Sequence, residues 1–112
     1  TYANHLKASN TATDIVGFVV DDPYERFEIQ SNNAGASAVT DVGKTADLAY
    51  TAGSAPNFVS KVEFNDSGLN TTAQQLKIMG FSKDPSNNSV ASANVNLVVI
   101  IAEHELKVTT GT

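Results

Sequence analysis

The stretch that decides the fold is Val95-Asn96-Leu97-Val98-Val99-Ile100-Ile101, the strongest apolar run in the chain. Five of its seven residues are β-branched, a composition that favours strands over helices. An apolar run that does not alternate with polar residues is typical of a strand buried on both faces. We therefore expect residues 94–106 to contain the central strand of a sheet.

Four further segments place apolar side chains at every second position, which is the period of a half-buried strand. They are residues 24–30, 47–51, 59–65 and 72–81, with inward-facing pairs predicted at Phe27 and Ile29, Leu48 and Tyr50, Val62 and Phe64, and Leu76 and Ile78. Residues 15–20 form a short β-branched run that predicts another well-buried strand. Asp21, Asp22 and Pro23 interrupt the chain after it, so residues 15–20 and 24–30 form either a hairpin or one kinked strand.

The sequence thus predicts about six strands at intervals of roughly ten residues, and this spacing indicates a mainly β fold. The expected architecture is a single antiparallel β-barrel or β-sandwich. Helix is expected at most as a short turn near residues 39–44, which Thr40 or Asp41 could cap and Gly43 could end. We expect an extended N-terminal arm over residues 1–13, a β domain over 14–108 and a polar tail over 109–112.

The composition of the chain excludes several classes of function. The chain has 112 residues, enough for one domain, and a formal net charge of −5. Without a basic face it is not expected to bind nucleic acid or an anionic membrane surface. It has no cysteine, which excludes disulfides and thiol chemistry, and its longest apolar run, residues 97–102, is too short to span a bilayer.

Motifs that could bind an ion or a phosphate are incomplete. Residues 38–45 fit a loosened phosphate-loop pattern, but Ala38 replaces the first glycine and Asp41 would place a negative charge in the cradle. A polar loop precedes this stretch, whereas a phosphate loop follows a buried strand. Asp21 and Asp22 could contribute to a calcium site, although they lack the alternating acidic spacing of calcium loops. Turn chemistry explains both stretches, and a metal near Asp21 and Asp22 stays open.

The groups of residues that could form a catalytic site are also incomplete. Glu103 and Glu105 would share one face of a strand and His104 the other, so the three do not converge. A zinc site would require His5 and His104 to meet a carboxylate, which the sequence neither supports nor excludes. Glu25 and Glu28 would lie on opposite faces, unlike a glycosidase pair, and no serine has nucleophile-elbow glycines around it. We expect a chain that is not an enzyme, with no catalytic residue, cofactor or metal ligand.

Several segments together resemble a known family. They are Val20-Asp21-Asp22-Pro23-Tyr24 with Phe27-Glu28-Ile29-Gln30, Asp41-Val42-Gly43-Lys44-Thr45-Ala46-Asp47-Leu48, Gln75-Leu76-Lys77-Ile78-Met79-Gly80 with Asp84-Pro85 and Asn87-Asn88, and residues 98–104. In this order and spacing they resemble small head proteins of tailed bacteriophages that are assigned as decoration or cement proteins. The resemblance covers about residues 15–106, and it carries over no catalytic residue.

The resemblance implies a virion structural protein on the outer surface of the phage head. There it would bind the major capsid protein at joints between subunits, together with sister copies, and stabilise the shell. Contacts are expected at exposed apolar side chains that a single core does not need, namely Tyr2, His5, Leu6, Tyr24 and Phe27. The alternative is a receptor- or glycan-binding β module of a phage fibre or cell-surface protein. Oligomeric state leaves no mark in such a sequence.

Overall fold

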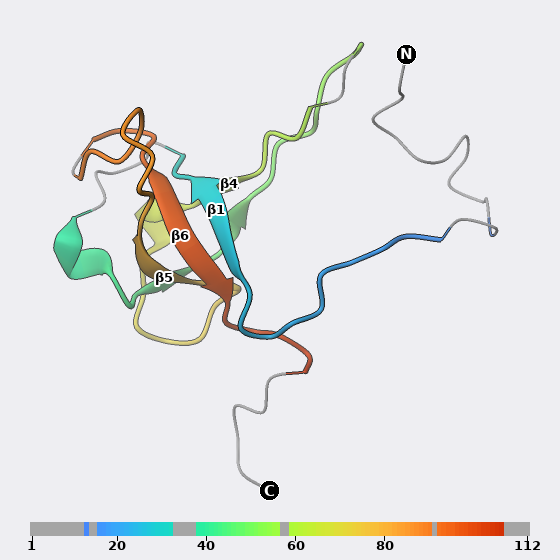
Figure 1. Ribbon diagram of the computed structural model, residues 1–112, viewed down its shortest axis with the longest axis horizontal. Coiled ribbons are helices and arrows are strands. Elements are labelled where there is room, and N and C mark those ends of the chain that lie inside the picture. The colour runs from blue at the N-terminus through green and yellow to red at the C-terminus, as the bar shows by residue number, and fades with distance from the viewer. Residues whose placement is uncertain (1–12, 14–15, 33–37, 57–58, 91, 107–112) are drawn as a thin grey trace, which may run out of the picture.

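Six strands form two antiparallel sheets in the computed structural model, which describes residues 13, 16–32, 38–56, 59–90 and 92–106 (Figure 1). The strands are β1 (Arg26–Gln30), β2 (Thr45–Ala46), β3 (Leu48–Ala49), β4 (Glu63–Phe64), β5 (Leu76–Phe81) and β6 (Asn96–Ile101). The larger sheet has the order β1-β6-β5-β2, and the smaller one pairs β3 with β4. The mainly β, antiparallel fold is therefore confirmed, although the two sheets do not close into a barrel.

The central strand is the one that the sequence predicts. β6 lies between β1 and β5, and it pairs with β1 over residues 96–100 and with β5 over residues 97–101. Leu97 and Val99 are buried on one face, whereas Val98 and Ile100 on the other face are only half-buried, so the expectation of full cover on both faces is wrong. The core is formed by seven apolar side chains: Ala46, Phe64, Leu76, Ile78, Val95, Leu97 and Val99.

A single helical turn occurs where it was expected. The 3-10 helix η1 (Val39–Asp41) begins with the Ala38 N–H donating to the Asp41 carboxylate at 2.7 Å. The chain then turns at Gly43, whose φ of +95° is a conformation that glycine adopts readily. The Gly43 N–H donates to the Ile78 carbonyl at 2.8 Å, so β5 fixes the end of the turn. A second 3-10 helix, η2 (Asp66–Gly68), occupies a stretch with strong turn residues.

One predicted strand is absent, and the strands within residues 47–51 and 59–65 are shorter than predicted, namely β3 and β4 with two residues each. Residues 16–20, the described part of the run predicted as a buried strand, are all exposed, and Phe18 is 101% exposed. Tyr50 is 77% exposed and not inward-facing, because β3 and β4 pair over only two residues each and the connection between them leaves the body. Figure 1 shows both segments projecting from the sheets. Leu76, Ile78 and Phe64 are buried as predicted.

Candidate interaction surface

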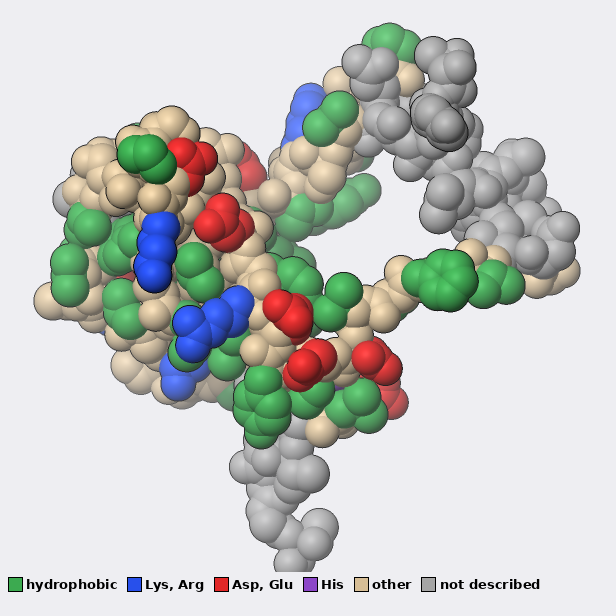
Figure 2. All heavy atoms as spheres, in the orientation of Figure 1, with side chains coloured by type: hydrophobic (Ala, Val, Ile, Leu, Met, Phe, Trp, Pro, Cys, Tyr) green, Lys and Arg blue, Asp and Glu red, His purple; other side chains and the backbone are tan. Residues whose placement is uncertain are grey.

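The first candidate surface is the projecting segment that precedes β1. Its exposed large side chains, over residues 16–24, are Val16 (80%), Phe18 (101%), Val19 (83%), Val20 (55%) and Tyr24 (69%). Figure 2 shows apolar side chains along this segment and acidic ones where it joins the body. Contiguous apolar side chains on a protein surface mark an interaction site, whereas single ones are ordinary. Residues 16–20 are therefore a candidate for contact with another polypeptide.

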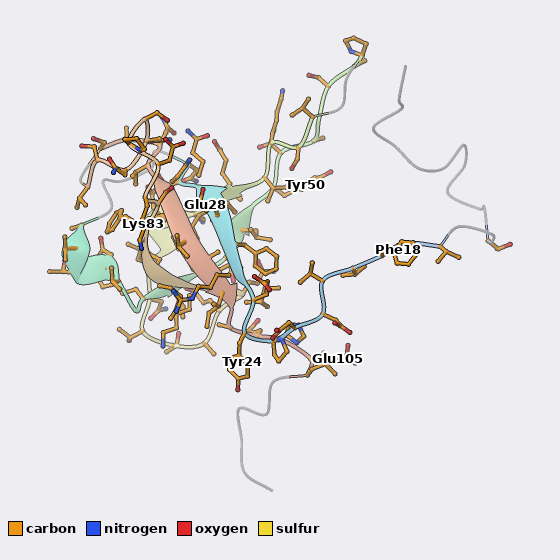
Figure 3. All side chains as sticks on the ribbon, in the orientation of Figure 1. Phe18, Tyr24, Glu28, Tyr50, Lys83 and Glu105 are labelled. Carbon is orange, nitrogen blue, oxygen red and sulfur yellow. The ribbon has the colours of Figure 1, made fainter. Side chains whose placement is uncertain are left out.

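A turn connects this segment to β1 and sets its direction. The Tyr24 N–H donates to Asp22 Oδ1 at 2.9 Å, and the Glu25 N–H donates to the Asp22 carbonyl at 3.3 Å. Pro23 occupies the middle of this turn and fixes its own φ near −65°. Tyr24, one of the predicted partner-binding residues, extends outward at the base of the segment, while Phe18 lies far along it (Figure 3). Tyr24 is thus exposed, as a contact residue must be.

The second candidate surface is an apolar groove between the two sheets, with a volume of about 350 Å³. Its apolar lining is Phe27, Ile29, Leu48, Val62, Leu76, Val99 and Ile101. Phe27, another predicted partner-binding residue, is half-buried in it and packs against the core. Leu48 and Val62 were both predicted to face inward. Leu48 is instead 41% exposed and Val62 is half-buried, and nothing in their alternation marks the groove. The groove exists because the smaller sheet does not continue alongside β1.

The backbone of β1 forms the third candidate surface. Ser31, directly after β1, donates its N–H to the Val95 carbonyl at 3.0 Å. In an antiparallel strand, successive residues direct their backbone N–H and C=O groups to opposite sides. Phe27 and Ile29 therefore bond toward β6, as Ser31 does, whereas Glu28 and Gln30 direct their backbone groups outward. No described strand pairs with residues 26–29 on this outward side. β4 closes its C-terminal end, where Ser31 and Phe64 form an isolated parallel bridge and the Asn32 N–H donates to the Phe64 carbonyl at 2.9 Å. We call the outward backbone of residues 26–30 the β1 edge.

The connection between β3 and β4 is the fourth candidate surface, called here the 50–62 loop. Tyr50 is 77% exposed and Val59 is 63% exposed (Figure 3). The two sides of the loop approach each other where the Lys61 ammonium lies 3.4 Å from the Ser54 hydroxyl. The sequence predicted strands over residues 47–51 and 59–65 and no projecting loop. Gly53, Pro56 and a separation too long for a tight hairpin are the features that could have indicated one.

The acidic and basic groups of the phosphate-loop-like stretch are paired with each other. Lys44 Nζ donates to Asp41 Oδ1 at 2.8 Å, and this bond, with the Ala38 N–H, holds the pKa of Asp41 below its ordinary value of 3.8. The lysine that would contact a phosphate thus neutralises a buried carboxylate. Asp84 has a similarly local role: the backbone N–H and then the hydroxyl of Ser86 lower its pKa from 3.8.

The remaining candidate ligands are dispersed. The described residues contain no cluster of three His, Asp or Glu side chains that could hold a metal ion. The Asp22 carboxylate accepts the Tyr24 N–H within its turn. His104 is half-buried and accepts the Leu106 N–H at Nδ1 at 3.0 Å, between two exposed glutamates. Tyr2, His5 and Leu6, the other predicted contact residues, lie outside the described part of the chain.

Comparisons with protein families, with curated proteins and with solved structures found no match to this chain. In the described part of the chain, no helix has the length and apolar character needed to cross a bilayer. The basis for inferring a function is therefore the set of four surfaces above: residues 16–20, the apolar groove, the β1 edge and the 50–62 loop.

Proposed function

We propose that this chain is a structural protein of a bacteriophage head, a decoration or cement protein that binds the outer capsid surface at joints between major capsid subunits. The observation that carries the proposal is the pair of projecting segments, residues 16–24 and the 50–62 loop, which extend exposed apolar side chains away from one small β body. A cement protein works by contact area and copy number, and it needs no reactive group.

The physical argument starts from the exposed side chains. Val16, Phe18 and Tyr50 each leave most of their surface in water, and burying such a side chain stabilises a complex by about 1.5–3 kcal/mol. Copies bound side by side on an icosahedral lattice act multivalently, so modest contacts of each copy add up to a stable layer. Such a layer opposes separation of the capsid subunits beneath it.

The 50–62 loop is the part best suited to reach across a subunit joint. Each of its two sides has about six residues, which span roughly 20 Å when extended. Its root is fixed by the β3–β4 pairs, Leu48 with Phe64 and Ala49 with Glu63. Tyr50 and Val59 then offer apolar contacts on a segment that the core does not use. We assign the capsid contact to this loop, with Tyr2, His5, Leu6 and Tyr24 as additional contacts.

The glycan-binding alternative has less support. Carbohydrate sites commonly stack sugars on aromatic rings and position polar groups around them. The apolar groove has one aromatic ring in its lining, Phe27, which is half-buried against the core. Tyr24 and Tyr50 belong to different projecting segments, so neither completes a stacking platform in the groove.

Binding to phage heads tests the proposal. Heads of the encoding phage that lack this protein would be incubated with purified chain, and occupancy would be measured by co-sedimentation and electron microscopy. We expect saturable binding at a fixed ratio to the capsid protein and a higher temperature of DNA release. Tyr50→Ser with Val59→Ser should weaken binding at least about tenfold, since two apolar contacts are lost. Deleting residues 1–13 should also weaken it while the β domain stays folded.

The matched control is Val39→Ser with Val42→Ser, which removes two exposed apolar side chains from the region of η1. This variant should bind heads like the unmodified chain. Equal binding of the loop variant would refute the assignment of the capsid contact to the 50–62 loop. Failure of the unmodified chain to bind heads would refute the proposed function, and binding to a glycan array instead would favour the alternative.

A further inference from the structure

Residues 16–20 and the groove beside β1 are complementary, and both are unpartnered in the described part of the chain. We propose that residues 16–20 of one copy add as an antiparallel strand to the β1 edge of a second copy, where Val16, Phe18 and Val20 cover the apolar groove. The partner is thus a second copy of this chain, joined by strand exchange. This inference concerns the isolated protein and does not depend on capsid binding.

The first argument is the match in period. β1 has five residues, and the described part of the exposed apolar segment, residues 16–20, is long enough to lie beside it. In an extended strand Val16, Phe18 and Val20 share one face. On β1 the half-buried residues, Phe27 and Ile29, also alternate with exposed ones, and they face the groove. A strand beside β1 therefore extends the same apolar face across the groove.

The second argument is the backbone of the β1 edge. Glu28 and Gln30 direct their N–H and C=O groups away from β6. No described strand pairs with residues 26–29 on this side, although β4 meets the outward side just after Gln30 at the parallel Ser31–Phe64 bridge. The open part of the edge is a template for an added strand. Residues 16–20 contain no proline, so every one of them can donate to such a ladder.

The third argument is that a tight hairpin onto the segment's own β1 is disfavoured. Two-residue hairpin loops favour type I′ or II′ turns, which have positive φ at their first central residue. Pro23 occupies that position in the turn over residues 22–25 and is held near −65°. The one non-glycine residue with positive φ in the described part is Asn94. The turn therefore sends the segment away from its own strand, as Figure 1 shows, and leaves it for another copy.

The antiparallel direction is the one that every pair of the larger sheet uses, and it is slightly more stable per residue than parallel pairing. Charge does not add to this preference. The aspartates that follow the added segment, Asp21 and Asp22, would lie beside the start of the second copy's β1, where Arg26 is exposed. Glu25 and Glu28 lie there too and keep their negative charge, because their hydrogen-bond donors, the Arg26 N–H and the Ser82 hydroxyl, are neutral.

Cross-linking between single-cysteine variants tests the proposal, because the natural chain has no cysteine. Val20→Cys protein and Leu48→Cys protein would be mixed and treated with a short bis-maleimide, so that Phe18 stays intact. We expect a covalent heterodimer, since Leu48 lines the groove that Val20 would cover. The control mixes Val20→Cys with Val39→Cys, whose side chain is exposed on η1, and it should give little of the heterodimer.

The double variant, with both cysteines in one chain, separates the two possible acceptors. Cross-linked dimers support exchange, whereas a predominantly cross-linked monomer would show that the segment folds back on its own groove and would overturn the proposal. Sedimentation of the cysteine-free chain should show a concentration-dependent dimer, and Phe18→Ser should raise the dimer dissociation constant at least about tenfold. A dimer that Phe18→Ser leaves unchanged would also overturn it.

A folding defect in Phe18→Ser would not explain a weaker dimer. Phe18 is fully exposed within its own chain, so Phe18→Ser removes no intramolecular packing, and its circular dichroism should match that of the unmodified protein. Because the measurements use the purified chain alone, a negative result refutes strand exchange without bearing on head binding. Conversely, a dimer that does not bind heads would refute the proposed function and leave the exchange intact.

Discussion

Phe64 is the residue that joins the two sheets. Its side chain is fully buried in the core, and its carbonyl accepts the Asn32 N–H at 2.9 Å just beyond β1. Phe64→Ala should therefore lower the free energy of unfolding by about 3–5 kcal/mol, through lost burial and the cavity left behind. Urea denaturation measures this change. Val59→Ala, at an exposed position, should alter stability by less than about 0.5 kcal/mol. Similar effects at the two positions would contradict the placement of Phe64 in the core.

Asp41 makes stability depend on pH. Lys44 first, and the Ala38 N–H second, lower the pKa of this carboxyl in the folded chain below 3.8. The stabilising contribution is therefore complete above the unfolded pKa, and it is lost as the pH falls through the lower folded value. Asp41→Ala should cost about 1 kcal/mol of unfolding free energy at pH 7, as lost caps do. This difference should shrink as the solution is acidified below about pH 4.

Denaturation of both proteins at pH 7 and at pH 3 measures that difference. Glu103→Ala serves as the control, because Glu103 is exposed and lies outside the strands. It should change stability little at either pH. A penalty for Asp41→Ala that stays constant down to pH 2 would mean that the Lys44 bond does not contribute through the charge of the carboxylate.

At the scale of elements, the joint between η1 and β5 depends on one glycine. Gly43 has a φ of +95°, where a Cβ is strained, while Gly80 in β5 has an ordinary φ and open space around its Cβ position. Gly43→Ala should thus destabilise the protein by about 1 kcal/mol or more. Gly80→Ala should be neutral or stabilise it by up to about 1 kcal/mol. Thermal unfolding of the two variants tests the contrast, and a reversed order would place the strain elsewhere.

Sequence patterns located the elements that form most of the core. β5 and β6 fall within the segments predicted from alternation and from the β-branched run, because neighbours in the same sheet bury these side chains. Residues 16–20 have an equally apolar composition. Composition alone, however, cannot indicate whether another strand lies beside a segment and pairs with it in the folded chain. The breaker after them, Pro23, was interpreted as a hairpin turn or a kink between two strands, and it did not indicate that the run leaves the sheet. Tertiary context therefore decided between burial and exposure.

The candidate surfaces were predictable only in part. Tyr24 is exposed as a contact residue must be, and Phe27 lines the groove. The groove itself depends on where the smaller sheet stops, and the two-residue length of β3 and β4 is not encoded in the alternation of residues 47–51 or 59–65. Sequence spacing likewise did not show that Leu48 and Val62 would line a groove. Those features arise from the packing of one sheet against the other.

At the scale of the whole molecule, burial and exposure are unevenly divided. The described core has seven buried apolar side chains, while exposed large ones recur along residues 16–20 and the 50–62 loop. A small core of this kind gives limited stability on its own. In the proposed assembly, contacts with other chains would add to this stability.

Strand exchange between copies makes stability depend on protein concentration. A ligand or partner that binds only the folded chain raises its unfolding temperature by mass action, and for a dimer the partner is the chain itself. A tenfold rise in concentration adds about 1.4 kcal/mol per dimer. For a domain of this size that corresponds to a rise of about 3–6 °C in the unfolding midpoint.

Calorimetry at two concentrations tenfold apart measures this shift. The unmodified chain should show it, and Phe18→Ser should not, because the variant lacks the side chain that fills the neighbour's groove. Val39→Ser removes an equally apolar exposed side chain from η1 and should keep the shift. A midpoint of the unmodified chain that does not move with concentration would show that the copies fold independently, and the apolar segment would then require a partner other than this chain.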